Sequence, residues 1–163
     1  MNHSTRGFTI VELLIVIVVI AILASITIVA YNGIQNSAHD ASVQSDISNF
    51  AKKIEIERVQ SADGQYPTSL TPAMGFAFAQ GSYDTSGFNL YYCYNPTTNK
   101  LAFGVASKTG NSWSYTTDDG VRPYAGRIYG SNTCGLIDSS WGGAGIVNLN
   151  GYTTGGGWAS WTN

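Results

Sequence analysis

The side chains that could do chemistry in this 163-residue chain are few and widely spaced. Past the first seven residues the only histidine is His39, so a catalytic triad or a two-histidine metal site has no partners to draw on. The run Asp118-Asp119-Gly120 lacks the alternating oxygen ligands of a calcium loop and is typical of a turn. No phosphate-binding, nucleophile-elbow or zinc-spaced pattern is present. We therefore expect no catalytic residue, no metal, no cofactor and no enzymatic activity.

The two cysteines, Cys93 and Cys134, have a different meaning in different compartments. An even pair in an exported domain usually forms a disulfide, whereas in a cytosolic protein the same two would be free thiols of the core. Only 11% of the residues are charged, and the chain has 19 glycines and 10 tyrosines, a profile of exported surface proteins. The chain has 8 Lys and Arg in total and a net charge of −2. Because a surface that binds phosphates needs clustered basic residues, we infer no specific binding to nucleic acid.

Residues 8–30 form an apolar segment whose only charge is Glu12. As a helix it would be roughly 35 Å long, enough to cross the core of a bilayer. The only basic residue before it is Arg6 and the next is Lys52, so the N-terminus is expected in the cytoplasm and the rest of the chain outside. A secretory signal peptide is the alternative, but its apolar region is usually shorter.

Glu12 is not explained by a plain membrane anchor. A carboxylate at membrane depth costs about 2.5 to 3.5 kcal/mol at the bilayer centre and less near its edge, and it usually marks a functional contact. A glutamate that simply lies among the lipid headgroups is the simpler reading. The functional interpretation requires a cation close to Glu12.

The sequence around Glu12 resembles the cleavage and methylation motif of type IV pilins and pseudopilins, over residues 6–30. The residues that carry the resemblance are Gly7-Phe8-Thr9-Ile10-Val11-Glu12-Leu13-Leu14. It implies that a prepilin peptidase cuts between Gly7 and Phe8 and methylates the new amine of Phe8. That amine, charged and buried in a filament core, would be as costly as the carboxylate of Glu12. Pairing the two between neighbouring subunits removes both costs and sets the register of the helices.

The resemblance implies a structural subunit of an extracellular type IV pilus, with adhesion and motility as its associated roles. The chain would be held in the cytoplasmic membrane as a precursor and then be polymerised at the cell surface. Its partners would be copies of itself in a helical homopolymer, the prepilin peptidase, the inner-membrane pilus assembly machinery and, before assembly, the membrane. A pseudopilin of a type II secretion or DNA-uptake machine has the same motif and stays open as the alternative.

Beyond the apolar segment the sequence predicts that the helix continues to about residue 59. Apolar residues spaced by three and four are expected along one buried face: Ile34, Ala38, Ala41, Val43, Ile47, Phe50, Ala51, Ile54 and Val59. Many pilins have a proline where this chain has Val29, and the next weak point of the helix is Asn32-Gly33. The turn formers and two prolines of residues 61–75 predict that the helix ends between residues 60 and 63.

The remaining sequence predicts a small sheet. Runs rich in β-forming residues occur at residues 76–80, 88–95, 101–107 and 113–117. The second and third are joined by residues 96–100, a plausible hairpin turn. We expect a pilin-like α+β fold in which the long helix lies on an antiparallel sheet of three or four strands.

The expected organisation is a leader (1–7), a transmembrane and filament-core helix (8–30), an amphipathic half of the helix (31–60) and a β-rich body (61–163). The body ends in a region rich in glycine and aromatic residues, with Trp141, Tyr152, Trp158 and Trp161 well spaced. This region could be loosely packed, add strands to the sheet, or form a subunit interface or adhesive surface. A packed or interface role is favoured because four large aromatics in water would form an unusual apolar surface.

Overall fold

The computed structural model describes residues 7–139 and 145–163, and for Val29 only the backbone. Contacts within the chain divide it into two units, Met1–Ser37 and Ala38–Asn163. Helix α1 (Ile10–Gln60) runs through both and is continuous at Asn32-Gly33, which confirms the long helix expected from the sequence. It ends at the first residue of the predicted range.

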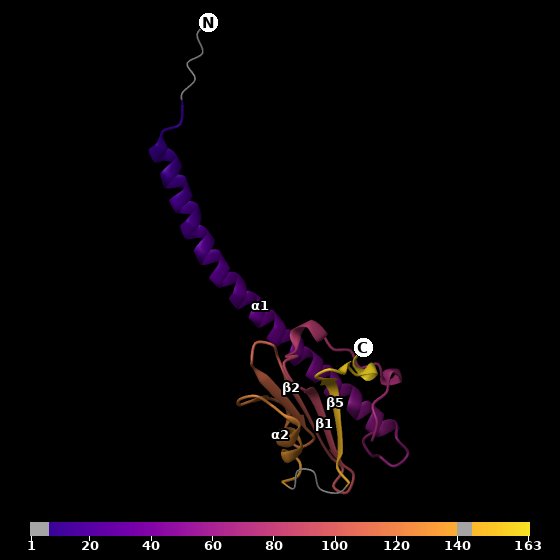
Figure 1. Ribbon diagram of the computed structural model, residues 1–163. Coiled ribbons are helices and arrows are strands. Elements are labelled where there is room, and N and C mark those ends of the chain that lie inside the picture. The colour runs from indigo at the N-terminus through magenta and orange to yellow at the C-terminus, as the bar shows by residue number, and fades with distance from the viewer. Residues whose placement is uncertain (1–6, 140–144) are drawn as a thin grey trace. The chain divides into compact units, whose positions relative to one another are not determined.

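The second unit contains a six-stranded antiparallel sheet with the strand order β4-β3-β2-β1-β5-β6. Figure 1 labels its middle strands β2, β1 and β5. The strands are β1 (Asn89–Asn95), β2 (Lys100–Ala106), β3 (Ser112–Thr116), β4 (Gly120–Tyr124), β5 (Val147–Thr153) and β6 (Gly157–Trp158). The first four form a meander, and β5 returns to pair with the free side of β1. The α+β, pilin-like prediction is confirmed, as is the hairpin turn between β1 and β2. The predicted number of strands was too small, because three of them arise in the glycine-rich region.

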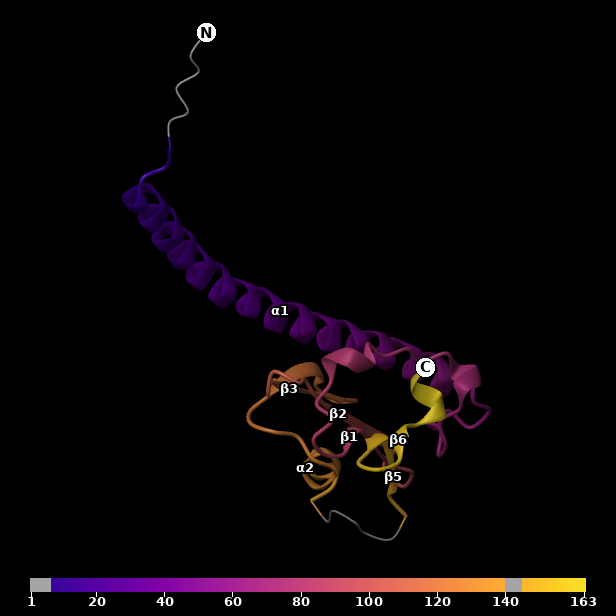
Figure 2. The ribbon, with the colours of Figure 1, turned by 45° about the horizontal axis from the view of Figure 1, so that its top comes forward.

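Every residue of the central strand β1 is buried. Because successive side chains point to opposite sides of a sheet, both faces of the sheet must be covered at this strand. Leu90, Tyr92 and Tyr94 belong to the main core, which α1 covers. Tyr91 and Cys93 belong to small clusters on the opposite face, beside helix α2 (Gly130–Gly135). Figure 2 shows the sheet between these two helices within the second unit.

Gly104 of β2 lets the segment with α2 approach the sheet closely. A Cβ atom at this position would lie 2.4 Å from Thr133 Oγ1 and 2.6 Å from Ile128 Cδ1. Both neighbours are buried, Ile128 at 1% exposure and Thr133 at 0%. A side chain here would therefore push α2 off the sheet.

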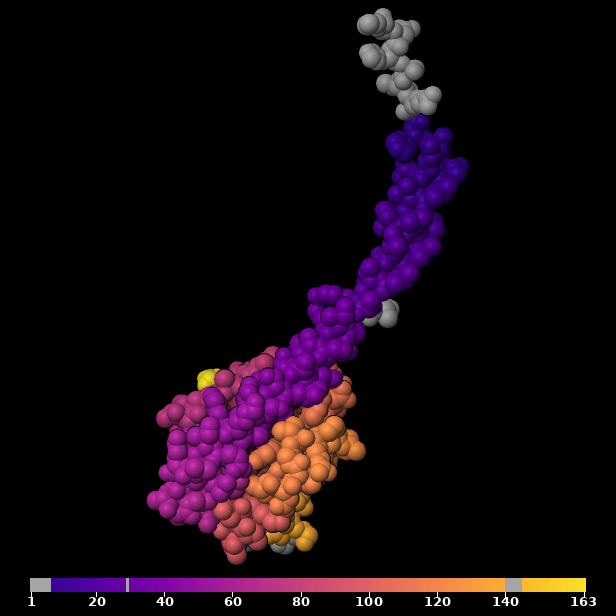
Figure 3. Space-filling model, turned by 180° about the vertical axis from the view of Figure 1, so that it is seen from behind, coloured from indigo at the N-terminus to yellow at the C-terminus, as the bar shows by residue number. Residues whose placement is uncertain are grey.

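The side of α1 that is buried in the core includes fewer residues than the sequence predicted. Val43, Ile47, Phe50 and Ile54 are at most 1% exposed, and Ala51 is partly buried against them. The prediction was wrong for four exposed residues, namely Ile34, Ala38, Ala41 and Val59. At about 100° per residue, these four lie about 120° to 180° around the helix from Ile47. Figure 3 shows that residues 38–60 of α1, which belong to the second unit, expose one side of the helix at the surface of that unit.

Residues 76–80 form no strand, contrary to prediction. Phe76 and Phe78 do alternate into the core, which explains the pattern, but this segment has no strand beside it to complete a ladder. Its Ala79 N–H instead donates to the Asp46 carboxylate of α1 at 2.7 Å. Three short 3₁₀ helices complete the body: η1 (Pro72–Met74), η2 (Gln80–Ser82) and η3 (Ser160–Thr162).

The C-terminal region packs against the body, one of the outcomes that the sequence left open. Trp161 is 6% exposed and makes edge contacts with Phe76 and Phe78 of the core. Trp158 contacts the rings of Tyr83 and Tyr152. Trp141 lies outside the described residues. Most of the large aromatics in this region thus serve as core or as its edge.

Candidate functional site

The first turn of α1 is closed by hydrogen bonds between Thr9 and Glu12. The Thr9 N–H and hydroxyl both donate to Glu12 Oε2, at 2.8 and 2.7 Å, and the Glu12 N–H donates to Thr9 Oγ1 at 3.2 Å. Such a reciprocal arrangement is a capping box, which satisfies backbone donors that a helix start leaves unpaired. Glu12 therefore has a role within its own chain as well as any role toward a neighbour.

The capping box leaves one carboxylate oxygen available. Both bonds from Thr9 go to Oε2, and among the described residues Oε1 has no hydrogen-bond partner. Sequence reasoning did not assign a role to Thr9. The Thr-x-x-Glu spacing directly before an apolar run was the signal that could have identified it.

Gly7 and Phe8 precede the helix and lie outside its hydrogen-bonded turns. Both are exposed, Phe8 at 83%, and among the described residues no atom other than those of its chain neighbours lies within 4 Å of the position of a Cβ on Gly7. The peptide bond between them is therefore on accessible, non-helical chain. The predicted cleavage there stays a prediction, and residues 1–6 of the expected leader lie outside the described residues.

The other polar side chains of residues 8–30 are hydrogen-bonded within α1. Ser25 Oγ donates to the Ile22 carbonyl at 2.7 Å, and Thr27 Oγ1 donates to the Ala24 carbonyl at 2.9 Å. Hydroxyls satisfied in this way are tolerated in a lipid environment. Among the described residues, α1 is the one helix that by length and composition could span a membrane, with a mean hydropathy of 3.3 over its most apolar window.

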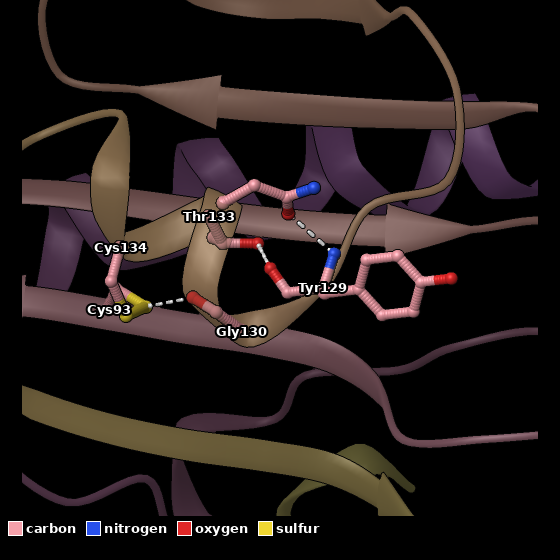
Figure 4. Close-up of a disulfide and its surroundings, with 6 residues drawn as sticks. Cys93, Tyr129, Gly130, Thr133 and Cys134 are labelled. Carbon is pink, nitrogen blue, oxygen red and sulfur yellow. Dashed lines mark hydrogen bonds between the residues drawn. A yellow bond between two sulfur atoms is a disulfide. The ribbon is translucent and has the colours of Figure 1, made fainter. Parts of the chain in front are cut away.

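Cys93 and Cys134 are joined by a disulfide in the second unit, with their Cα atoms 5.1 Å apart. Both are buried, at 0% and 2% exposure. Figure 4 shows how the bond ties α2 to the central strand β1. The start of α2 is held by hydrogen bonds to Tyr129, whose carbonyl accepts from Thr133 Oγ1 at 2.7 Å.

Glu55 of α1 accepts hydrogen bonds from two parts of the body, the loop after α1 and strand β3. Its Oε1 accepts hydrogen bonds from the hydroxyls of Tyr66 and Tyr115, and its Oε2 forms an ion pair with Arg58 Nε at 2.9 Å. Burial acts to raise the pKa of Glu55, but the hydrogen bonds from both tyrosines and Arg58, with the charge of Arg58, lower it below its ordinary value. The ionised form is therefore the one that the fold favours.

Asp40 and Asp46 are two further carboxylates by which α1 holds the body. Asp40 accepts from the Thr109 hydroxyl and from Asn111 Nδ2, and these bonds lower its pKa despite the opposing effect of burial. Asp46 accepts from the Tyr83 hydroxyl at 2.9 Å, yet burial is the larger effect and raises its pKa. All of these contacts lie within the second unit.

The remaining candidates from the sequence have structural partners. Asp118 and Asp119 lie in the predicted turn, between β3 and β4, and form ion pairs with Lys100 and Arg122 at 2.6 and 2.9 Å. His39 Nδ1 lies 3.1 Å from Ser82 Oγ. Within residues 7–139 and 145–163, no group of three or more His, Cys, Asp or Glu side chains could hold a metal ion.

The prokaryotic N-terminal methylation motif matches residues 2–28. This motif is the signature of type IV pilins and pseudopilins, which are structural proteins, and it includes Gly7, Phe8 and Glu12. No match was found among curated proteins or among solved structures. The chain thus combines a pilin-type N-terminus with a pilin-like α+β fold, and the motif together with the apolar helix fits anchoring in a membrane before assembly.

Proposed function

We propose that this chain is a structural subunit of an extracellular type IV pilus, processed by a prepilin peptidase and polymerised through α1. The observation that supports it best is the placement of Glu12. Within the matched motif, its carboxylate is held at the start of an apolar helix by Thr9, with Oε1 available to a partner. The assembly contact on this proposal is the methylated amine of Phe8 from a neighbouring copy.

Before assembly, residues 8–30 anchor the precursor in the cytoplasmic membrane and the body lies outside. Residues 1–7 are the leader, and cleavage after Gly7 creates the charged amine of Phe8. Residues 31–60 then connect this helix to the body at 61–163. The inner-membrane assembly machinery would draw the helix into a bundle of copies, where lipid no longer surrounds its side chains.

The two carboxylate oxygens of Glu12 allow it to cap its own helix and to contact a neighbouring copy at the same time. Oε2 accepts the hydrogen bonds from Thr9 that cap the helix. Oε1 accepts a hydrogen bond from the ammonium of the neighbour's Phe8. Leaving either charge unpaired in an apolar core would cost about 3 to 5 kcal/mol, so copies out of register are disfavoured. A single buried polar contact can set helix register in this way.

The substitution Glu12→Gln tests this proposal sharply, because glutamine preserves the capping box but removes the charge. We expect normal membrane insertion and leader cleavage but few or no surface filaments, counted by electron microscopy. Thr9→Val is the matched variant, since it removes the hydroxyl of the cap and keeps the charge, and it should impair assembly less. Filament numbers at the wild-type level in Glu12→Gln would contradict the proposed contact.

A pseudopilin of a type II secretion or DNA-uptake machine carries the same motif and is the alternative. The disulfide between Cys93 and Cys134 supports an exposed pilus, because such bonds persist in oxidising surroundings. The aromatic C-terminal region adds no support, since Trp158 and Trp161 pack against the body. Mass spectrometry of purified surface filaments separates the two functions. A pilus subunit should be the main protein of the filaments, whereas a pseudopilin should be absent from them.

A further inference from the structure

A polar groove of about 800 Å³ lies where α1 ends. Three segments form it: the last turn of α1, the loop that follows, and the end of β1 with its hairpin turn. The residues that line it are Glu57, Gln60, Ser61, Asp63, Gln65, Tyr66, Pro67, Thr68, Tyr94 and Pro96. We call it the α1-end groove, and all of it lies within the second unit.

Hydrogen bonds within the chain hold the loop of the α1-end groove in place. The Tyr92 hydroxyl donates to the Pro67 carbonyl at 2.7 Å, and Asn99 Nδ2 donates to the Gly64 carbonyl at 3.2 Å. The Gln65 N–H donates to Ser61 Oγ and to Asp63 Oδ1, both at 3.1 Å. A ligand would therefore meet a preformed surface and lose little free energy in ordering it.

Several polar side chains in the groove can form further hydrogen bonds. Among the described residues, the carboxylate of Glu57, the amide of Gln60 and the hydroxyl of Thr68 have no hydrogen-bond partner. Asp63 uses only Oδ1, so its second oxygen is also available. The groove thus offers both donors and acceptors.

The set of lining residues narrows the class of ligand. Among the described residues, no lysine, arginine or histidine lines the groove, so a phosphate, a sulfated chain or another anion would meet the charges of Glu57 and Asp63 unpaired. An ammonium could pair with the carboxylates of Glu57 and Asp63, but it offers donors alone and so makes no hydrogen bond to the donors of Gln60 and Thr68. A sugar hydroxyl both donates and accepts, and so satisfies each kind of group.

We propose that the α1-end groove binds a neutral oligosaccharide. Its volume is within the range of about 300 to 1,000 Å³ that is usual for ligand sites. The rings of Pro67 and Pro96 add apolar surface for the C–H faces of a sugar. This binding does not depend on whether the chain forms filaments.

The test uses the full chain, purified in a zwitterionic detergent that contains no sugar. It is screened against an array of neutral oligosaccharides, and the best binder is then titrated by NMR. Spermine and a sialylated trisaccharide serve as the cationic and anionic probes. We expect neutral oligosaccharides to bind with millimolar or better affinity and both charged probes to bind more weakly.

Variants place the binding in the groove. Glu57→Ala and Gln60→Ala should each weaken binding by about fivefold or more, as expected for the loss of a hydrogen bond. Gln44→Ala, an exposed glutamine on the same helix but outside the groove, is the matched control and should have no effect. The proposal is overturned if no neutral oligosaccharide on the array binds, if spermine binds best, or if the groove variants bind as well as Gln44→Ala.

Discussion

The two units of this chain present their apolar residues in opposite ways. In the first, every side chain described between residues 8 and 37 is exposed, including Phe8 at 83% and Leu23 at 58%. In the second, Ile47 and Leu101 are fully buried in one core. An apolar surface as large as that of the first unit normally belongs to an interaction site or a membrane. The comparison indicates that the second unit is stabilised by its own chain, and the first by what surrounds it.

The largest effect should come from removing a ring at the centre of the core. Phe50 is 1% exposed, and its ring stacks on Phe103 with the ring centroids 3.9 Å apart. Phe50→Ala should lower the free energy of unfolding by about 3 to 5 kcal/mol through lost burial and the resulting cavity. Denaturant unfolding of the full chain in detergent, followed by tryptophan fluorescence, measures this.

Leu14→Ala is the control from the other unit. Leu14 is 51% exposed, so its loss should leave the unfolding of the body unchanged. If Phe50→Ala cost less than about 1 kcal/mol, or Leu14→Ala cost as much as Phe50→Ala, the contrast between the units would be wrong.

The next effect concerns the disulfide, which closes a loop with a sequence separation of 41 between Cys93 and Cys134. Cys134→Ser should cost about 2 to 4 kcal/mol, with chain entropy setting the upper value. Because the bond ties α2 to β1, limited proteolysis should cut the region beyond residue 118 sooner, while membrane insertion through residues 8–30, as proposed, should be unaffected.

Thiol labelling checks whether the bond exists in the native protein. Unreduced, unfolded wild-type chain should take up no alkylating reagent. Two labelled cysteines per chain would show that something other than this bond holds α2 on the sheet.

A smaller, pH-dependent effect is expected at Glu55. Its hydrogen bonds with two tyrosines and Arg58 are worth about 1 to 2 kcal/mol after allowance for its partial exposure, and Glu55→Gln should lose that amount at neutral pH. Because its pKa is lowered in the fold, this stabilisation is present above the unfolded value, near 4, and disappears as the pH falls through the folded value. Unfolding curves of both proteins should therefore converge in acid. A difference that stays constant from neutral pH to below the folded pKa would contradict the assignment.

The long helix and the first hairpin could be predicted because their signals are local. An apolar segment followed by spacings of three and four gives the helix, and β-forming runs flanking a turn give β1 and β2. The side of the helix that is buried was harder to predict. Val43 and Val59 both fit spacings of three and four, yet only the first lies on the side that the sheet covers.

Strand β5, in the region for which the sequence left added strands as one of several outcomes, depends on its neighbours rather than on its own composition. Its sequence is rich in asparagine and contains Gly151, where a Cβ would lie 2.7 Å from Leu90 Cβ and 2.9 Å from the Trp161 ring. That glycine is required by a close approach that only the fold reveals. The converse error, a strand at residues 76–80, came from an alternation that has no strand to pair with.

For the candidate site, the motif alone was enough to select Gly7, Phe8 and Glu12. The motif does not reveal the role of Thr9, because a contact between chains accounts for Glu12 without any partner in its own chain. The groove at the end of α1 could not have been predicted either, since its lining residues come from three segments that meet only in the fold.

The most direct test of the proposed function is the intact mass of this chain in purified surface filaments, with sequencing of its N-terminal peptide. The account predicts that the chain is a major component and begins at Phe8 with a methylated amine, residues 1–7 having been removed. Filaments whose subunits still carry Met1, or that begin at any residue other than Phe8, would contradict it.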